Sequence, residues 1–286
     1  MVDIVIPKWL ADYCSNEERR EWLAGLPGAV AELSNRWQLE LGPPFEREPG
    51  PSLVLPATLA AGGEAILKLG MPHMEATHEI DALRFWNGDG AARLLQADVE
   101  KNALLLERCR PGTLLRERPE EEQDEVIAGL LRRLWRTPDK PHPFRPLAEM
   151  TARWGQETRA AERDWPDAGL VRAALQLYDE LPRSPPAQVL LATDLHAANV
   201  LRAEREEWLV IDPKPFVGDA AYDATQHLFN CSDRLCGDPL GTIGRFADLL
   251  GVESERVRLW VFARAATGPW DFDSARIWEL VRKLAP

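Results

Sequence analysis

Cysteine is scarce in this sequence, with only four among 286 residues, and no two of them are separated by just two positions. The absence of a CxxC pair excludes a zinc ribbon. So few cysteines in a chain of this length also exclude a fold held together by disulfides. We therefore predict that Cys14, Cys109, Cys231 and Cys236 are structural residues whose thiols are reduced.

Long apolar runs are also absent. The longest uncharged stretch, residues 51–63, is interrupted by prolines and glycines and is shorter than the roughly 18 residues that a membrane span needs. The opening segment MVDIVIPKWL has neither the basic region nor the apolar region of a secretory signal. We expect a cytoplasmic protein with no membrane partner.

Positive charge is in deficit. Lysine and arginine number 34 against 46 aspartates and glutamates, which gives a net charge of -12. Such a surface repels phosphate backbones, so we expect no nucleic-acid partner. It is compatible with a cationic small-molecule substrate, although solubility is the plainer explanation of the charge.

What the sequence does contain is enough apolar material for a sizeable core, because 45% of its residues are hydrophobic and 28% are charged. The apolar spacing predicts helical structure over residues 16–40, interrupted near Pro27, and then two strands, 52–59 and 64–70, joined by a tight turn. A helix over 73–87 and a strand over 103–109 follow. The beginning of the chain is therefore predicted to form an α+β lobe.

The rest of the chain is predicted to be mostly helical, from the long amphipathic segment 119–135 to the C-terminal helices. Two short strands, AQVLLATD and EEWLVIDP, are expected on either side of the turn AEREE. We accordingly divide the chain into an N-terminal lobe, residues 1–108, and a C-terminal lobe, residues 109–286.

The segment LLATDLHAANVL and the strand WLVI place polar residues where chemistry can be built. Asp194 suits the orientation or deprotonation of an accepting hydroxyl, while Asn199 and Asp212 are hard oxygen ligands suited to Mg²⁺ on a nucleotide. Taken singly, each is more simply explained as a turn or cap residue. Their occurrence together, after two apolar strands, favours phosphoryl transfer.

Lys68 lies inside the strand AILKLG, where a charge facing a sheet surface is costly unless it has a purpose. A phosphotransferase needs such a cation on its nucleotide phosphates, held by a carboxylate from the following helix. Glu79 is the best placed partner, and Glu75, one helical turn earlier, remains an alternative. A solvated lysine on an edge strand is the simpler explanation if the later motif is ignored.

These stretches resemble the aminoglycoside phosphotransferase family, which has the eukaryotic protein kinase-like fold. Within that family, RFWNGDGAARLL and WLVIDPKPFVGD are similar to the branch of streptomycin 6-phosphotransferases and hydroxyurea phosphotransferases. The resemblance covers most of the chain after about residue 50. It implies an α+β bilobal fold, with a small β-sheet lobe carrying one main helix and a larger, mostly α-helical lobe.

The resemblance also implies residue roles. The catalytic base would be Asp194, the Mg²⁺ ligands Asn199 and Asp212, and the phosphate-binding ion pair Lys68 with Glu79. The nucleotide would be ATP or GTP.

Further positions follow from the resemblance. Backbone groups at the hinge, around Glu107, Arg108 and Cys109, would hydrogen-bond the adenine, while Asp219 and Asp223 would brace the catalytic loop. The family usually has His-Gly before the catalytic aspartate, where this chain has Ala192-Thr193.

In kinases of this family the C-terminal helices build the acceptor pocket, which draws attention to Trp270 and to its neighbours Asp271 and Asp273. Those carboxylates suit a guanidinium or ammonium of an acceptor, and helix capping explains them as well. We expect a monomeric or homodimeric ATP-dependent kinase that phosphorylates a cationic aminoglycoside such as streptomycin and so confers resistance. The alternatives are a hydroxyurea or other metabolite kinase, or a nucleotide-binding module with little catalysis.

Overall fold

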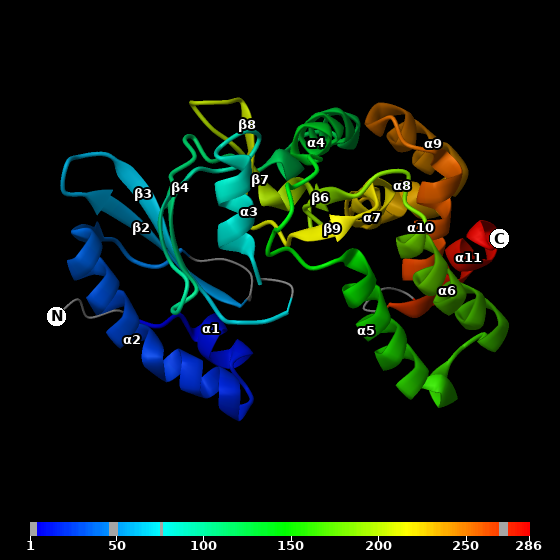
Figure 1. The fold of residues 1–286 in the computed structure, drawn as a ribbon, viewed down its shortest axis with the longest axis horizontal. Coiled ribbons are helices and arrows are strands. Elements are labelled where there is room, and N and C mark those ends of the chain that lie inside the picture. The colour runs from blue at the N-terminus through cyan, green and yellow to red at the C-terminus, as the bar shows by residue number, and fades with distance from the viewer. Residues whose placement is uncertain (1–4, 46–50, 75–76, 269–273) are drawn as a thin grey trace. The chain divides into compact units, whose positions relative to one another are not determined.

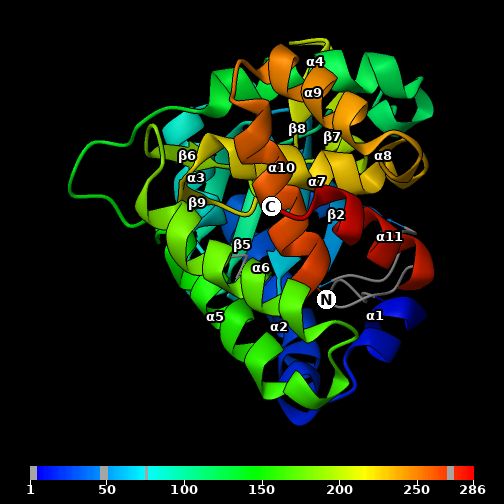
Figure 2. The same ribbon diagram turned by 90° about the vertical axis from the view of Figure 1, so that its right-hand side faces the viewer.

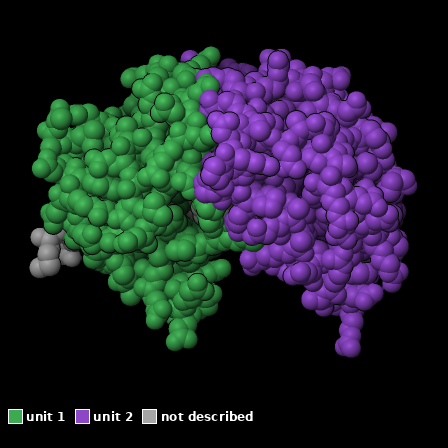
Figure 3. Space-filling view, viewed as in Figure 1, with its two compact units in different colours: residues 1–112, 203–207 green, residues 113–202, 208–286 purple. Residues whose placement is uncertain are grey.

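The computed structural model describes residues 5–45, 51–74, 77–268 and 274–286. Its chain divides into two compact units, which are coloured separately in Figure 3: unit 1 comprises residues 1–112 and 203–207, and unit 2 comprises residues 113–202 and 208–286. No helix within the described ranges is long and apolar enough to cross a membrane.

Unit 1 is built on one five-stranded antiparallel sheet with the strand order β1-β2-β3-β5-β4. Its central hairpin turns at Gly62 and Gly63, whose φ angles of 80° and 103° lie where glycine is favoured. The elements of unit 1 are α1 (Lys8–Tyr13), α2 (Glu17–Trp37), β1 (Leu39–Leu41), β2 (Ser52–Leu59), β3 (Glu64–Gly70), α3 (Glu79–Trp86), β4 (Leu94–Asp98) and β5 (Ala103–Glu107).

The predicted interruption of the first long helix is wrong. Helix α2 runs without a break through Pro27, although a proline removes one helical hydrogen bond and crowds the preceding turn. The helix persists because Leu26, Val30 and Leu33 on one of its faces are fully buried against the sheet. Packing of this apolar face outweighs the local cost of the proline.

The predicted strands 52–59 and 64–70 are present with those bounds, whereas the predicted helix 73–87 and strand 103–109 are present but shorter. Helix α3 begins at Glu79 rather than near residue 73, because the preceding His78 adopts a left-handed conformation with φ of 73°. Strand β4 was not predicted, since its side chains are mostly half-exposed and carry no clear alternation. The α+β class of the fold is nevertheless confirmed.

Helices dominate unit 2, and α10 lies at its centre. Figure 2 shows α10 surrounded by α6, α7, α9 and α11, and its side chains, such as Trp260 and Phe262, are buried all around the helix. The helices are α4 (Glu120–Leu134), α5 (Leu147–Ala160), α6 (Ala168–Glu180), α7 (Ala220–Asn230), α8 (Ser232–Gly237), α9 (Pro239–Leu250), α10 (Ser254–Thr267) and α11 (Ser274–Leu284), with short 3₁₀ turns η1 (Leu115–Glu117), η2 (Glu162–Asp164), η3 (Leu181–Arg183) and η4 (Ala197–Asn199).

The small β-structure of unit 2 contains both predicted strands, each paired with a strand that was not predicted. The two predicted strands do not pair with each other. Instead, β6 (Val189–Leu191) pairs with β9 (Phe216–Gly218), and β7 (Val200–Arg202) pairs with β8 (Trp208–Val210). Strand β7 was missed because three residues are too few to show a period. Both antiparallel pairs flank the predicted catalytic segment (Figure 1).

Candidate active site

Lys68 and Glu79 form a buried ion pair in unit 1. Lys68 lies in the middle of β3, level with Val54 and Leu104 on the neighbouring strands. Its Nζ lies 2.6 and 2.7 Å from the two carboxylate oxygens of Glu79, the first residue of α3. The two side chains are only 7% and 2% exposed. Burial of both charges is tolerated because each satisfies the other through two contacts.

The predicted hinge begins at Glu107, the last residue of β5, whose carboxylate is held by Arg205. The Arg205 guanidinium donates to both carboxylate oxygens, at 3.0 and 2.6 Å, and Arg93 donates its backbone N–H at 2.8 Å. Burial opposes ionisation, but these hydrogen bonds outweigh it and lower the pKa of Glu107. Sequence analysis missed Arg205, because a partner nearly a hundred positions away leaves no local pattern.

The other side chains of the predicted hinge are paired with a carboxylate or buried. Arg108 contacts Glu64 at 2.9 Å and Arg110 contacts the same carboxylate. The thiol of Cys109 is buried, and this burial raises its pKa to about 11, so it is protonated at neutral pH. Ion pairs thus account for the two arginine side chains at this segment, and burial accounts for the thiol.

In unit 2, Asp194 lies on the loop that follows β6, and the two residues before it are held by hydrogen bonds. The preceding Thr193 adopts φ of 43°, a left-handed conformation that disfavours a β-branched residue. Its hydroxyl donates to the carbonyl oxygen of Lys214 at 2.6 Å, and the Lys214 N–H donates to the Ala192 carbonyl at 2.9 Å. The left-handed conformation of Thr193 is thus held by side-chain and backbone bonds.

Asp223 of α7 also holds this loop, through hydrogen bonds to its backbone. Its carboxylate accepts the backbone N–H groups of Ala192 and Thr193 at 3.0 and 2.8 Å, and the indole N–H of Trp135 at 2.9 Å. Complete burial raises the pKa of Asp223 to about 6 against the opposing effect of these donors. The predicted brace is therefore in contact with the residues that precede Asp194.

Asp219, by contrast, makes its side-chain hydrogen bonds with α7 and α10 and none with residues 192–194 in the described part of the chain. Its carboxylate caps α7 at Ala221 and accepts from Arg256 and Trp260 of α10, both at 2.6 Å. It secures one helix of unit 2 to another. The imidazole of His196 accepts the N–H of Ala198 at 3.4 Å and thereby caps a short 3₁₀ turn.

Asn199 and Asp212 come to the same end of the β7–β8 hairpin. The N–H of Ile211 donates to the Asn199 carbonyl at 2.9 Å, which continues the ladder beyond Val200 and Val210. The Asn199 amide nitrogen donates to the Asp194 carbonyl oxygen at 3.0 Å. Because that bond uses the amide nitrogen, the side-chain oxygen is the Asn199 atom suited to a hard cation.

Asp212 has an ammonium group beside it that sequence analysis did not identify. The Nζ of Lys214 lies 2.5 Å from Oδ1 of Asp212, and the Lys214 side chain is only 9% exposed. An amide oxygen and a carboxylate at one hairpin end form an oxygen donor set that fits Mg²⁺. Proline flanks Lys214 on both sides, so the WLVIDPKPFVGD motif did contain this residue.

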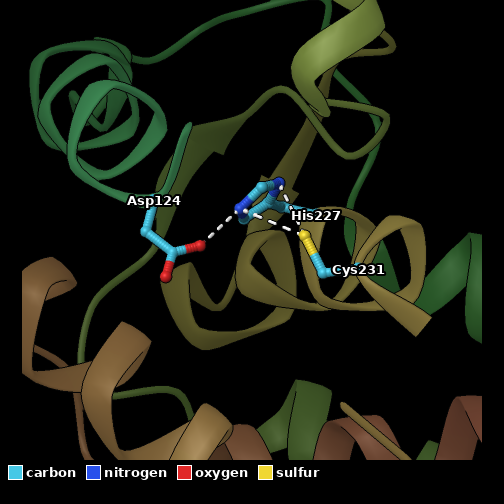
Figure 4. A group of neighbouring side chains, drawn as sticks. All are labelled: Asp124, His227 and Cys231. Carbon is cyan, nitrogen blue, oxygen red and sulfur yellow. Dashed lines mark hydrogen bonds and ion pairs between the residues drawn. The ribbon is translucent and has the colours of Figure 1, made fainter. Parts of the chain in front are cut away.

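A cluster of one carboxylate, one imidazole and one thiol lies elsewhere in unit 2 (Figure 4). Asp124 of α4 accepts from Nε2 of His227 at 2.8 Å, and Sγ of Cys231 lies 3.8 Å from that nitrogen. All three residues are buried, and their ligand atoms lie within 4.8 Å of one another. The trio resembles a metal site or a nucleophilic triad in composition.

Its surroundings oppose both functions. Arg234 donates to both oxygens of Asp124 at 2.7 Å, and Arg245 donates at 2.9 Å. Two guanidinium groups therefore occupy the carboxylate that a metal would need. Burial also raises the pKa of Cys231 to about 12, which keeps the thiol protonated. We interpret the cluster as an ion network that joins helices.

Four of the predicted positions lie outside the described residues. These are the three acceptor-site residues and the alternative partner of Lys68, namely Trp270, Asp271, Asp273 and Glu75.

The fold is that of the small-molecule kinases. The chain superposes on choline kinase LicA from Streptococcus pneumoniae with a TM-score of 0.62 at 12% identity, over 91% of this chain and 98% of that chain. Such low identity establishes the fold alone, and the kinase-like architecture predicted from sequence is confirmed.

Sequence similarity then defines the family. The family model "Aminoglycoside/hydroxyurea antibiotic resistance kinase" matches residues 40–274. A streptomycin 6-kinase of Streptomyces griseus is 38% identical over 94% of this chain and 92% of its own length. A hydroxyurea phosphotransferase of Kitasatospora aureofaciens is 38% identical over 90% and 76%. The chain belongs to this family of antibiotic resistance kinases and is a phosphotransferase whose family implies ATP as donor.

Proposed function

We propose that this enzyme transfers the γ-phosphoryl group of ATP to a hydroxyl of a cationic aminoglycoside, with streptomycin as the first acceptor to test. The observation that carries the proposal is the 38% identity to a streptomycin 6-kinase over nearly the full length of both chains. The net charge of -12 supports a cationic acceptor. The reaction would take place in the cytoplasm, where ATP is available, and would protect the cell from the antibiotic.

The residues of both units are assigned to one reaction. The acceptor hydroxyl oxygen attacks the γ-phosphorus while the bond from that phosphorus to the β,γ-bridging oxygen breaks, and ADP leaves. Asp194 orients the hydroxyl and takes its proton. Lys68, positioned by Glu79, contacts the nucleotide phosphates, and backbone groups of the segment 107–109 contact the adenine.

Asn199 and Asp212 would hold Mg²⁺ through their side-chain oxygens. An ion held there would supply positive charge that offsets the negative charge of the nucleotide phosphates. Asp223 and Thr193 hold the loop that carries Asp194, so that its carboxylate is positioned before the acceptor arrives. GTP is the second candidate donor, and the same assay with GTP in place of ATP tests it.

Hydroxyurea is the second candidate acceptor, because a hydroxyurea phosphotransferase is equally similar in sequence over 90% of this chain. The two candidates differ in charge, since hydroxyurea is neutral. A nucleotide-binding module with little catalysis was the third possibility, and membership in a kinase family makes it the weakest.

The test is Mg²⁺-dependent ADP release by the purified protein with streptomycin, hydroxyurea and several other aminoglycosides. Release that requires streptomycin supports the proposal, whereas release that requires only hydroxyurea transfers the assignment to the second candidate. Direct nucleotide binding is measured in parallel. Tight binding of ATP without release for any acceptor contradicts the proposed function and favours the binding module.

A further inference from the structure

Lys214 is a buried cation placed directly at the proposed metal ligand. Its Nζ lies 2.5 Å from Oδ1 of Asp212, and its side chain is 9% exposed against 27% for Asp212. A lysine side chain is usually mobile and solvated. The burial of Lys214 beside one carboxylate oxygen therefore indicates that the fold fixes the position of its ammonium group.

The backbone around Lys214 is rigid, which fixes where its side chain starts. Pro213 and Pro215 flank it, so the chain there is restricted on both sides. Its N–H donates to the Ala192 carbonyl at 2.9 Å, and its carbonyl accepts the Thr193 hydroxyl at 2.6 Å. These bonds tie Lys214 to the two residues immediately before Asp194.

The placement of this ammonium bears on the number of metal ions. In protein kinases, an aspartate and an asparagine that correspond to this pair hold two Mg²⁺ ions. Here one oxygen of Asp212 is already committed to Lys214, and a positive charge at that oxygen repels a second divalent cation.

We propose that the Lys214 ammonium replaces a second divalent cation beside Asp212, so that the enzyme binds one metal ion per nucleotide. The inference rests on the proposed function, which assigns Asp212 and Asn199 to the metal. Lys214 then supplies part of the positive charge that neutralises the phosphates, and this charge is fixed in the protein rather than drawn from solution.

The test counts Mn²⁺ ions bound to the full-length protein in the presence of the non-hydrolysable analogue β,γ-methylene-ATP, by electron paramagnetic resonance of the free ion. We expect one nucleotide-dependent Mn²⁺ per wild-type chain, one for Lys214→Arg, and two for Lys214→Met. Lys8→Met is the matched control, because Lys8 is an exposed lysine on α1 paired with Asp12, and it should bind one Mn²⁺.

Turnover gives a second measure. With limiting Mg²⁺, Lys214→Met should be slower by about tenfold to a hundredfold, and it should recover as Mg²⁺ is raised, whereas Lys214→Arg should lose little. Two Mn²⁺ in the wild type, or one in a Lys214→Met protein that still binds the analogue, would overturn the inference alone. Absence of any nucleotide-dependent Mn²⁺ in the wild type would overturn the proposed metal site and this inference with it.

Discussion

Single residues decide how the loop before Asp194 is held. Thr193 occupies a left-handed conformation with φ of 43°, which costs a residue with a Cβ roughly 1 to 2 kcal/mol relative to the right-handed conformation. The bonds that its N–H and hydroxyl make to Asp223 and Lys214 offset this cost. The conformational cost of Thr193 is therefore offset by contacts with Asp223 of α7 and with Lys214.

Thr193→Val tests that compensation, because valine keeps the branched shape and the backbone N–H but removes the hydroxyl. The Lys214 carbonyl loses its donor inside the protein, so we expect a loss of about 1 to 3 kcal/mol in the free energy of unfolding. Thr193→Ser retains the hydroxyl and should stay within about 1 kcal/mol of the wild type. Urea unfolding of the three proteins makes the comparison. Equal stability of the valine and serine variants would show that the hydroxyl bond contributes nothing.

Variants of the Lys68–Glu79 pair distinguish its contribution to stability from its contribution to activity. Either Lys68→Met or Glu79→Leu leaves one buried charge without its counterpart, and we expect each to cost about 3 to 5 kcal/mol. The double variant removes both charges and should recover most of that stability while remaining inactive. A double-mutant cycle by denaturant unfolding, with turnover measured beside it, gives both quantities. A double variant that is as active as the wild type would remove Lys68 from the mechanism.

Among the elements, local sequence predicted the strands better than their pairing. The β2–β3 hairpin was evident because apolar runs flank a Gly-Gly turn. The partners of β6 and β8 were not, since strands of three residues carry no period and their pairing is set by tertiary packing. Helix α2 shows the same limit, because burial of one face carried the helix through Pro27.

Four helices of unit 2 meet at Asp124. His227 of α7, Arg234 of α8 and Arg245 of α9 all contact its carboxylate on α4. Burial opposes ionisation of Asp124, but the hydrogen bonds from His227 and Arg234 outweigh it and lower the pKa to about 2. The charged carboxylate is thus more stable in the folded state than in the unfolded chain.

This shift predicts an acid-dependent loss of stability. Because the folded pKa is lowered, the contribution of Asp124 is present above pH about 4 and is lost as the pH falls toward about 2, by about 1 to 2 kcal/mol. The measurement is the free energy of unfolding as a function of pH, compared with Asp124→Asn, which should be less stable at neutral pH and show a shallower slope in this window. Parallel curves for the two proteins would contradict the assignment.

For the whole molecule, the class of fold and the main candidate residues could be predicted, since they rest on local motifs and on a family resemblance. Arg205 and Lys214 could not, because their roles depend on contacts that only the folded chain creates.

The net charge of -12 makes a prediction at this scale. A cationic acceptor is attracted by the summed field of the protein, and added salt screens that field, with a Debye length of about 10 Å at 0.1 M. We expect KM for streptomycin to rise severalfold as ionic strength is increased, while KM for neutral hydroxyurea stays constant. Steady-state kinetics over a series of salt concentrations measures both. A KM for streptomycin that does not respond to salt would show that the acidic surface serves solubility alone.

The most direct test of the central claim is identification of the product. Phosphorus NMR of a reaction containing ATP, Mg²⁺ and streptomycin should show a phosphate monoester on the antibiotic, formed in step with ADP. Asp194→Asn should form none, while Asp179→Asn, an exposed aspartate on α6, should match the wild type. Release of inorganic phosphate with no phosphorylated acceptor in the whole acceptor panel, or full activity of Asp194→Asn, would contradict the account.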